Sequence, residues 1–240
     1  MANKVLIYGS TGGIGSVLSR LLHSQGYDLH LVGRNEEKLT ALANELGCSS
    51  TCGDVTDSEH FTQVAQDAGD VLDGLVYAVG NINLRSLSRF NEEDLLHDFR
   101  LNALGAALAI QASLRSLKKS PEGASVVLFS SIAATQGFGF HTSVGMAKGA
   151  VRGLMLSLAA ELAPKVRVNA INPSLTRTPL ADAILRNEKI AESIAALHPM
   201  QRLGTPEDIA ALTAFLLSSE SSWITGQSFG VDGGRSTLRK

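Results

Sequence analysis

The sequence predicts an α/β fold with a doubly wound parallel sheet of about seven strands and helices on both faces. Apolar, β-branched runs alternate with segments of helical spacing along the 240 residues. These runs are apolar throughout, as strands are when both faces of a parallel sheet are buried. Such alternation implies right-handed crossovers and therefore a doubly wound sheet. No linker rich in proline, glycine or serine divides the chain, so we expect one domain over residues 1–240.

The predicted elements follow one another in order along the chain. Strands are expected at 4–9, 28–33, 72–80, 125–131, 166–173 and 227–234, with a weaker strand at 48–54. Helices are expected at 13–26, 35–46, 57–69, 92–118, 143–163 and 206–218. The segment 178–203 has irregular signals, including Pro179 and Pro199. We expect it to form a mobile lid over a site at the carboxyl ends of the strands.

Composition and charge argue against several classes of protein. The net charge is −2 and the basic residues are dispersed, which argues against a nucleic-acid or membrane-surface partner. The first apolar run is short and is followed by glycines, which is too little for a signal peptide or a membrane span. We therefore expect a cytoplasmic protein. Cys48 and Cys52 have no His or Cys companions at metal-binding spacing, so no metal site is expected.

A glycine-rich turn joins the first strand to the first helix. It reads Gly-Ser-Thr-Gly-Gly-Ile-Gly, with Gly9, Gly13 and Gly15 at the characteristic positions. Glycines permit a tight turn and let backbone N–H groups approach a pyrophosphate at the start of the helix. A simple strand-to-helix turn or an S-adenosylmethionine-binding domain opens in the same way. The turn alone therefore leaves these alternatives open.

Residues at later strand ends bear on the identity of the cofactor. Arg34 ends the second strand, where an acidic residue would bind the ribose hydroxyls of NAD and a basic one accommodates the 2′-phosphate of NADP. NADP is therefore favoured over NAD, although Arg34 could also be a solvated residue at a helix start. Asp54 could accept a hydrogen bond from adenine, or it could cap the next helix. Gly80 would let a ribose pack on bare backbone.

These motifs, and others further along the chain, resemble those of the short-chain dehydrogenase/reductase family, whose members have a single Rossmann-type domain. Besides the glycine turn, Tyr77-Ala-Val-Gly80 stands where that family has Asn-Asn-Ala-Gly. The stretch from Arg202 to Gly234 is close to the family's C-terminal pattern. The resemblance covers nearly the whole chain. It implies hydride transfer between a nicotinamide cofactor and a carbonyl group.

The resemblance also implies roles for three residues. Ser131 would hold the carbonyl oxygen, Lys148 would bind the nicotinamide ribose, and Asn102 would hold a water molecule. The family's tyrosine, whose pKa the lysine lowers, lies 13 residues after the serine and four before the lysine. Both spacings fall on Val144, which cannot donate a proton.

Other groups must then supply the proton. His141 lies seven residues before Lys148, so the two would share a face of a continuous helix. The enoyl-acyl-carrier-protein reductases, a related branch, have their tyrosine at this offset. His141 could be the acid, or it could face solvent in a loop while Ser143 caps the helix. A water held by Ser131, Lys148 and Asn102 is another candidate, and Tyr77 is a weaker one.

The candidate site residues fall into a catalytic and a cofactor-binding set. The catalytic candidates are Asn102, Ser131, His141 and Lys148. The cofactor-binding candidates are Gly9, Ser10, Thr11, Gly13, Ile14, Gly15, Arg34, Asp54, Val55, Ala78, Gly80, Asn102, Lys148, Pro173 and Thr178.

Three functions are compatible with these residues. The first is an NADP(H)-dependent oxidoreductase with an altered proton donor, acting on a carbonyl or a conjugated C=C bond. The second is a catalytically weak cofactor-binding regulator or scaffold, and the third is a structural partner without cofactor. Retention of Ser131 favours the first function.

The substrate and the assembly are predicted only in outline. The apolar residues Leu180, Ile184, Leu185 and Ile194 favour a small, largely apolar substrate. The helices expected at 92–118 and 143–163 carry more apolar surface than one sheet face needs, and the family resemblance implies that such helices meet between subunits. We therefore expect a homotetramer or homodimer.

Overall fold

Seven parallel strands form one sheet in the computed structural model, which describes residues 3–239. The order across the sheet is β3-β2-β1-β4-β5-β6-β7, so the predicted doubly wound fold is confirmed. The strand order reverses between β1 and β4, where ligands bind in sheets of this kind. The strands are β1 (Lys4–Tyr8), β2 (Asp28–Gly33), β3 (Ser49–Cys52), β4 (Gly74–Tyr77), β5 (Ala124–Phe129), β6 (Val166–Pro173) and β7 (Ser228–Val231).

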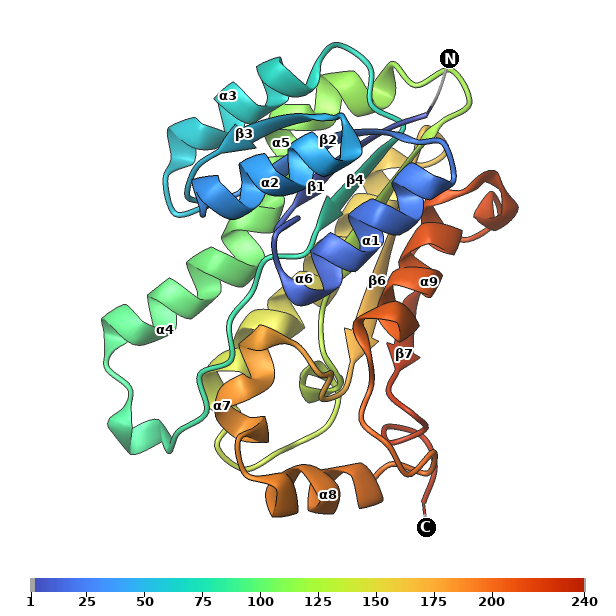
Figure 1. Cartoon of the computed structure of the whole chain (residues 1–240). Helices are drawn as coiled ribbons and strands as arrows, with labels where there is room; N and C mark the ends of the chain where they lie inside the picture. The colour runs from blue at the N-terminus through green and yellow to red at the C-terminus, as the bar shows by residue number, and fades with distance from the viewer. Residues whose placement is uncertain (1–2, 240) are drawn as a thin grey trace.

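Helices cover both faces of this sheet (Figure 1). Helices α3, α5 and α6 pack on one face, and α1, α2 and α9 pack on the other. The α-helices are α1 (Gly13–Ser24), α2 (Glu36–Leu46), α3 (Ser58–Ala68), α4 (Glu92–Phe99), α5 (Gly105–Lys118), α6 (Thr142–Leu162), α7 (Asp182–Leu185), α8 (Glu188–Ala196) and α9 (Pro206–Leu217).

The central strands are buried on both sides, which explains their apolar sequences. Successive strand residues point to opposite faces. In β1, Leu6 and Tyr8 lie in the core under α3 and α5, whereas Val5 and Ile7 lie in the core under α1 and α9. Each residue of such a strand therefore meets a helix layer, and no alternation of apolar and polar residues remains.

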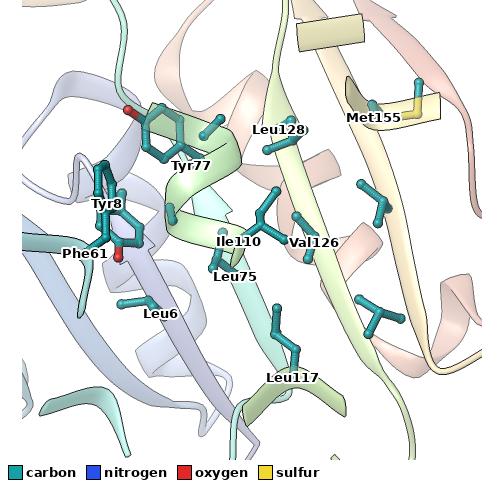
Figure 2. Packing of buried hydrophobic residues seen from close by; sticks show 14 of the residues in the cluster. Leu6, Tyr8, Phe61, Leu75, Tyr77, Ile110, Leu117, Val126, Leu128 and Met155 are labelled. Atoms are coloured by element: carbon teal, nitrogen blue, oxygen red, sulfur yellow. The ribbon is translucent and has the colours of Figure 1, made fainter. Parts of the chain in front are cut away.

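Two of the three tyrosines contribute to the first of these cores (Figure 2). The ring of Tyr8 lies 5.8 Å from that of Phe61 and 5.7 Å from that of Tyr77, between centroids. The Tyr77 hydroxyl donates to the carbonyl oxygen of Leu101 at 2.8 Å. These aromatic side chains therefore belong to the packing of β1 and β4 against α3 and α5.

Four predicted strands extend more than one residue too far at their carboxyl ends. The predictions 48–54, 72–80, 125–131 and 227–234 become strands that end at Cys52, Tyr77, Phe129 and Val231. The residues that follow β4 and β5 turn out of the sheet and line a cavity instead. After β7, Gly233 and Gly234 adopt positive φ angles, which end the extended conformation.

The helix expected at 92–118 is interrupted by a wider turn. A π-helical turn, Arg100–Leu104, separates α4 from α5. Asn102 lies in this turn, and such turns are frequent at functional sites. Neither proline nor glycine precedes the turn, so the sequence carries no local signal for it.

The segment 178–203 is more regular than its sequence predicts. It contains a 3₁₀ turn, Pro179–Ala181, followed by α7 and α8. The side chain of Asn187 caps α8 by accepting from the N–H groups of Lys189 and Ile190. Figure 1 shows α7 and α8 beyond the carboxyl ends of the strands. No helix within residues 3–239 combines the length and apolar character that a membrane span requires.

Candidate active site

A cavity of about 290 Å³ lies at the carboxyl ends of β4, β5 and β6. The loops that follow these strands supply residues 78–82, 129–133 and 173–176. The start of α6 and the segment from Thr178 to Ile194 form further parts of the wall. The cavity therefore occupies the place where doubly wound sheets bind their ligands.

The glycine turn passes close to the end of β4. Gly9 has a φ of +80°, and a Cβ there would lie 2.8 Å from the carbonyl oxygen of Ala78. A Cβ on Gly15 would collide with the carbonyl oxygen of Gly9. A side chain fits at neither position, so the turn stays tight enough to bring the start of α1 to the cavity.

The start of α1 is suited to an anion. The helix begins at Gly13 after Gly12, which has no side chain to cap the first N–H groups. Thr178 reaches this turn from the segment after β6, since a Cβ on Gly13 would lie 2.8 Å from its side chain. Free N–H groups at a helix start attract phosphate.

The other residues of the turn divide into structural and accessible groups. The Ser10 hydroxyl is buried and donates to the carbonyl oxygen of Val32 at 3.1 Å, so it holds the turn to β2. Thr11 lies beside the end of β2, since a Cβ on Gly33 would lie 3.0 Å from its hydroxyl. Ile14 lines the cavity together with Ala78.

Arg34 and Asp54 lie at the carboxyl ends of β2 and β3. Asp54 accepts from the backbone N–H of Thr56 at 2.8 Å. This bond, with a smaller contribution from the charge of Arg34, holds the pKa of Asp54 below its ordinary value. The alternative role of Asp54 as a helix cap is wrong, because Asp57 caps α3. Val55, next in the chain, is buried.

Lys148 and Asn102 meet at Gly80. A Cβ on Gly80 would lie 2.8 Å from Asn102 Oδ1 and 3.1 Å from Lys148 Nζ. The Lys148 ammonium donates to the carbonyl oxygen of Phe129 at 2.8 Å, and burial lowers its pKa to about 8. Asn102 Oδ1 is buried without a partner within the described chain. A bound hydroxyl or water at this point would satisfy that oxygen.

A buried polar network fixes the orientation of Asn102. Its amide nitrogen donates to Asn81 Oδ1 and to the carbonyl oxygen of Asp98, each at 2.8 Å. The Asp98 carboxylate in turn accepts from the amide of Asn81 and from the hydroxyl of Ser143. The prediction that Ser143 caps the helix is therefore wrong, since His141 occupies the cap position. Asp98 was not anticipated from the sequence, where it resembles a surface residue of an amphipathic helix.

Ser131 and Val144 face the same cavity. Ser131 Oγ accepts from the backbone N–H of Ala133 at 3.1 Å, so its own proton is free for a bound molecule. Val144 lies one helical turn before Lys148 and is 6% exposed. The position that the spacing assigns to a tyrosine therefore lines the cavity with a methyl-bearing side chain.

His141 lies at the start of α6 and also lines the cavity. Its Nδ1 lies 2.7 Å from the carbonyl oxygen of Gly139. A carbonyl only accepts, so Nδ1 carries the proton and Nε2 is left as a possible acceptor. The ring packs 5.3 Å from that of Phe138, between centroids.

No tyrosine lies among the cavity-lining residues of the described chain. The Tyr77 hydroxyl is bound to Leu101 inside the core, and burial raises its pKa. Tyr8 is fully buried in β1, and Tyr27 lies beyond the end of α1. Tyr77 as a proton donor is therefore excluded by the packing of β4.

Some lining residues were not anticipated from the sequence. Arg235 reaches the cavity from the C-terminal segment, with its guanidinium 5.3 Å from the centroid of the Phe138 ring. Ser174, after Pro173 of β6, also lines it. Leu180, Ile184 and Ile194 line the cavity as expected, but Leu185 does not.

Metal ligands do not gather in this part of the protein. Within residues 3–239, no group of three or more His, Cys, Asp or Glu side chains is placed to hold a metal ion. Among the described residues that line the cavity, Lys148 and Arg235 are the lysine and the arginine.

Comparisons with known proteins agree with this fold. Residues 9–236 match a family model described as enoyl-(acyl carrier protein) reductase. The chain is 33% identical over 248 residues to oxidoreductase UcpA of Salmonella typhimurium, covering 97% of this chain and 94% of that protein.

Two solved structures have closely similar folds. One is a short-chain type dehydrogenase/reductase from Mycobacterium ulcerans, with a TM-score of 0.92 and 31% identity over 99% of this chain and 90% of that chain. The other is ElxO with NADP bound, with a TM-score of 0.91 and 29% identity over 99% of this chain and 100% of that chain.

The buried Lys148 predicts a pH-dependent stability. Burial lowers the pKa of Lys148 from the ordinary value of 10.5 to about 8. Between pH 8 and 10.5, Lys148 is therefore mostly protonated in the unfolded chain and mostly neutral in the folded chain. The free energy of unfolding of the wild type, without added ligand, should therefore rise with pH relative to Lys148→Met. We expect a relative gain of about 2 kcal/mol between pH 7 and 10, measured by urea denaturation.

The exposed Lys118 on α5 provides the control. Lys118→Met should follow the wild-type curve over the same pH range, because an exposed ammonium keeps its hydration in the folded state. Parallel curves for Lys148→Met and the wild type would show that the Lys148 ammonium is not buried in a low dielectric.

Proposed function

Since the chain belongs to the short-chain dehydrogenase/reductase family, we propose that it is an NADP(H)-dependent oxidoreductase. Its substrate is a small, largely apolar molecule with a carbonyl or a conjugated C=C bond. The observation that carries this proposal is that Ser131 and Lys148 line one apolar cavity beside the glycine turn, where Asn102 meets Lys148 at Gly80. A protein that only binds a nucleotide has no need of a free serine hydroxyl at this place.

The side chains divide the work of the reaction between them. NADPH supplies the hydride when it is bound. The Ser131 hydroxyl donates a hydrogen bond to the substrate oxygen, which gains negative charge as the carbonyl carbon is reduced. Lys148 holds a ribose hydroxyl and adds positive charge beside this oxygen. Asn102, fixed by Asp98, offers its free oxygen to a water or a ribose hydroxyl.

NADP is favoured over NAD by charge and by analogy. Arg34 is exposed at the carboxyl end of β2, with Asp54 nearby. A guanidinium in this position attracts a 2′-phosphate. The related ElxO has been solved with NADP bound, which supports the same cofactor here.

The proton comes from a group other than tyrosine. His141 lines the cavity and has one ring nitrogen free of the Gly139 bond. A water held by Ser131, Lys148 and Asn102 is the other donor that the sequence suggested. General acid assistance typically contributes a factor of about 10²–10⁴, so its partial loss slows an enzyme without abolishing hydride transfer.

Val144 favours a second candidate function. A valine in place of the family's tyrosine is compatible with a protein that binds NADP(H) and acts as a regulator or scaffold. In that function Lys148 would serve only to bind ribose. Binding of NADPH without turnover of any substrate would distinguish this function from the first.

We expect Arg34 to set the cofactor preference. Wild-type protein should bind NADPH at least about tenfold more tightly than NADH, a difference of about 1.4 kcal/mol. Arg34→Asp should abolish or invert this ratio, because a carboxylate repels the 2′-phosphate and binds ribose hydroxyls. Titration of cofactor fluorescence measures both affinities. The control Arg115→Asp makes the same charge change on the exposed side of α5 and should leave the ratio intact. Equal affinities in the wild type would refute the assignment.

A tyrosine at position 144 should restore the missing donor. Val144→Tyr places a phenol one turn before Lys148, facing the cavity. We expect a higher kcat for simple ketones, followed by NADPH absorbance. Val144→Phe adds the same ring without the hydroxyl and should give no gain. An equal change in kcat for Val144→Tyr and Val144→Phe would contradict a donor role for the phenol hydroxyl. If the wild type and both variants bind NADPH but none turns over a ketone, the regulator function is favoured.

The exposed apolar residues support self-association. Trp223 is 99% exposed, and Met146 and Leu156 of α6 are about half exposed. We propose that α4 and α6 form a subunit contact and that the region of Trp223 forms another. Light scattering at micromolar protein concentration should give the molar mass of a dimer or tetramer for the wild type. Leu156→Glu should lower this molar mass, because a carboxylate would be buried in the subunit contact. The control Val71→Glu, on an exposed residue between α3 and β4 and outside α4, α6 and the Trp223 region, should not. A monomeric wild type would contradict this assembly.

A further inference from the structure

Ser174 and His198 form a buried hydroxyl–imidazole pair at the cavity. Ser174 directly follows β6, and its hydroxyl oxygen lies 2.8 Å from His198 Nε2. His198 follows α8 and is only 1% exposed. Its second ring nitrogen, Nδ1, lies 2.8 Å from the carbonyl oxygen of Ile194. Both ring nitrogens therefore have a partner.

These partners determine which nitrogen carries the proton in the neutral ring. The Ile194 carbonyl can only accept, so Nδ1 must donate to it. Nε2 is then left with its lone pair and accepts the proton of the Ser174 hydroxyl. A hydroxyl bonded to an imidazole that a third group orients is the arrangement that allows proton exchange through a serine.

The position of Ser174 gives this pair access to the reacting group. Ser174 lines the same cavity as Ser131 and Lys148. Strands β5 and β6 are neighbours, with Phe129 paired to Ile171, so Ser131 and Ser174 emerge at one edge of the sheet. A buried histidine that only stabilises its loop would need no partner at the cavity wall. His198 instead bonds Ser174, a side chain that borders the cavity.

The surroundings hold the ring in place. Gly233 lies against it, since a Cβ there would be 3.4 Å from His198 Cβ. The charged groups beside Gly233 have other partners or contacts: the Asp232 carboxylate accepts from the N–H groups of Gly234 and Ser236, and Arg235 lies over the Phe138 ring. The ring also faces the carboxyl end of α8, whose partial negative charge accommodates a cationic imidazole.

We propose that Ser174 exchanges a proton with the substrate oxygen and that His198 acts through it as the proton reservoir. This proposal rests on the proposed oxidoreductase function. The donor then lies after β6 and α8 and not on α6, where Val144 and His141 lie. Since His198 belongs to the segment 178–203, the relay is complete only when that segment lies against β6.

The proton balance differs between the two directions. In reduction, hydride goes to the carbonyl carbon and the C=O π electrons move to oxygen. That oxygen takes the Ser174 proton, while Ser174 takes the Nε2 proton of a protonated His198. His198 then regains a proton from solvent. In oxidation the neutral pair accepts: the alcohol proton passes to Ser174 Oγ, the Ser174 proton passes to Nε2, and hydride leaves to the oxidised cofactor.

The test combines kinetics with a tautomer measurement. Oxidation of NADPH would be followed with diacetyl, menadione, benzaldehyde and cyclohexenone. Ser174→Ala and His198→Gln should each lower kcat at least about tenfold, while the Kd for NADPH and KM for the substrate change little. The double variant Ser174→Ala/His198→Gln should have a kcat no lower than that of the slower single variant, because either substitution alone already breaks the Ser174–His198 relay. Ser174→Thr keeps the hydroxyl and should retain most activity.

Matched controls come from exposed residues of the same types. Ser193→Ala on α8 and His23→Gln on α1 should behave like the wild type. Nitrogen-15 NMR of the ring should show His198 protonated at Nδ1 and unprotonated at Nε2 in the neutral form. The Nε2 signal should shift in Ser174→Ala.

Each contrary result has a distinct meaning. Wild-type turnover that Ser174→Ala leaves within twofold overturns the relay and leaves the oxidoreductase function standing. A neutral ring protonated at Nε2 also overturns the relay, whatever the kinetics. Loss of activity in His141→Ala with none in Ser174→Ala assigns the proton to His141 instead. A wild type that binds NADPH but turns over no substrate defeats the oxidoreductase function, and the relay with it.

Discussion

The parallel pairing of β1 with β4 is the constraint on which the site depends. Tyr8 pairs with Tyr77, so both strands end at the same edge of the sheet. Their continuations then meet there: Gly9 turns against the backbone of Ala78, and Gly80 follows two residues later. Any side chain at Gly9 or Gly15 would separate these turns. The tight approach of backbone at this point determines where α1 begins and where Lys148 and Asn102 can meet.

The second constraint is electrostatic. Burial lowers the pKa of Lys148. Its ammonium donates to the Phe129 carbonyl oxygen and has further N–H groups for a bound oxygen. The side-chain oxygen of Asn102, which has no partner within the described chain, lies in the same place. The amide nitrogen of Asn102 donates to the Asp98 carbonyl oxygen and to Asn81. Asn81 in turn donates to the Asp98 carboxylate. Unpaired groups in a buried place destabilise the empty site. They also preorganise it, because a ligand that supplies a hydroxyl or a phosphate meets partners already in position.

A valine at position 144 makes the source of the proton the open chemical question of this site. The cavity borders two histidine arrangements of different character. His141 is tied to its own loop through the Gly139 carbonyl, whereas His198 bridges α8 and the residue after β6. The bridging arrangement couples the position of the segment 178–203 to a hydroxyl in the cavity. In the proposed function, closure over the substrate and completion of the proton path would be a single event.

The sequence by itself determined the fold class, the glycine turn, the strand ends that bear Arg34 and Asp54, and the absence of a tyrosine at position 144. Each of these depends on local spacing or on the two-sided burial of a strand, which the order of residues records directly. The family resemblance, carried by motifs along the chain, implied roles for Ser131, Lys148 and Asn102. Only the tertiary structure decided that Asp98 holds Ser143, that Arg235 reaches the cavity, that a π-helical turn carries Asn102, and that Ser174 meets His198. Asp98 and Ser143 are 45 positions apart in the chain, and Ser174 and His198 are 24 apart. Contacts between residues so far apart leave no periodicity in the sequence. They exist because separate elements converge at the carboxyl edge of one parallel sheet.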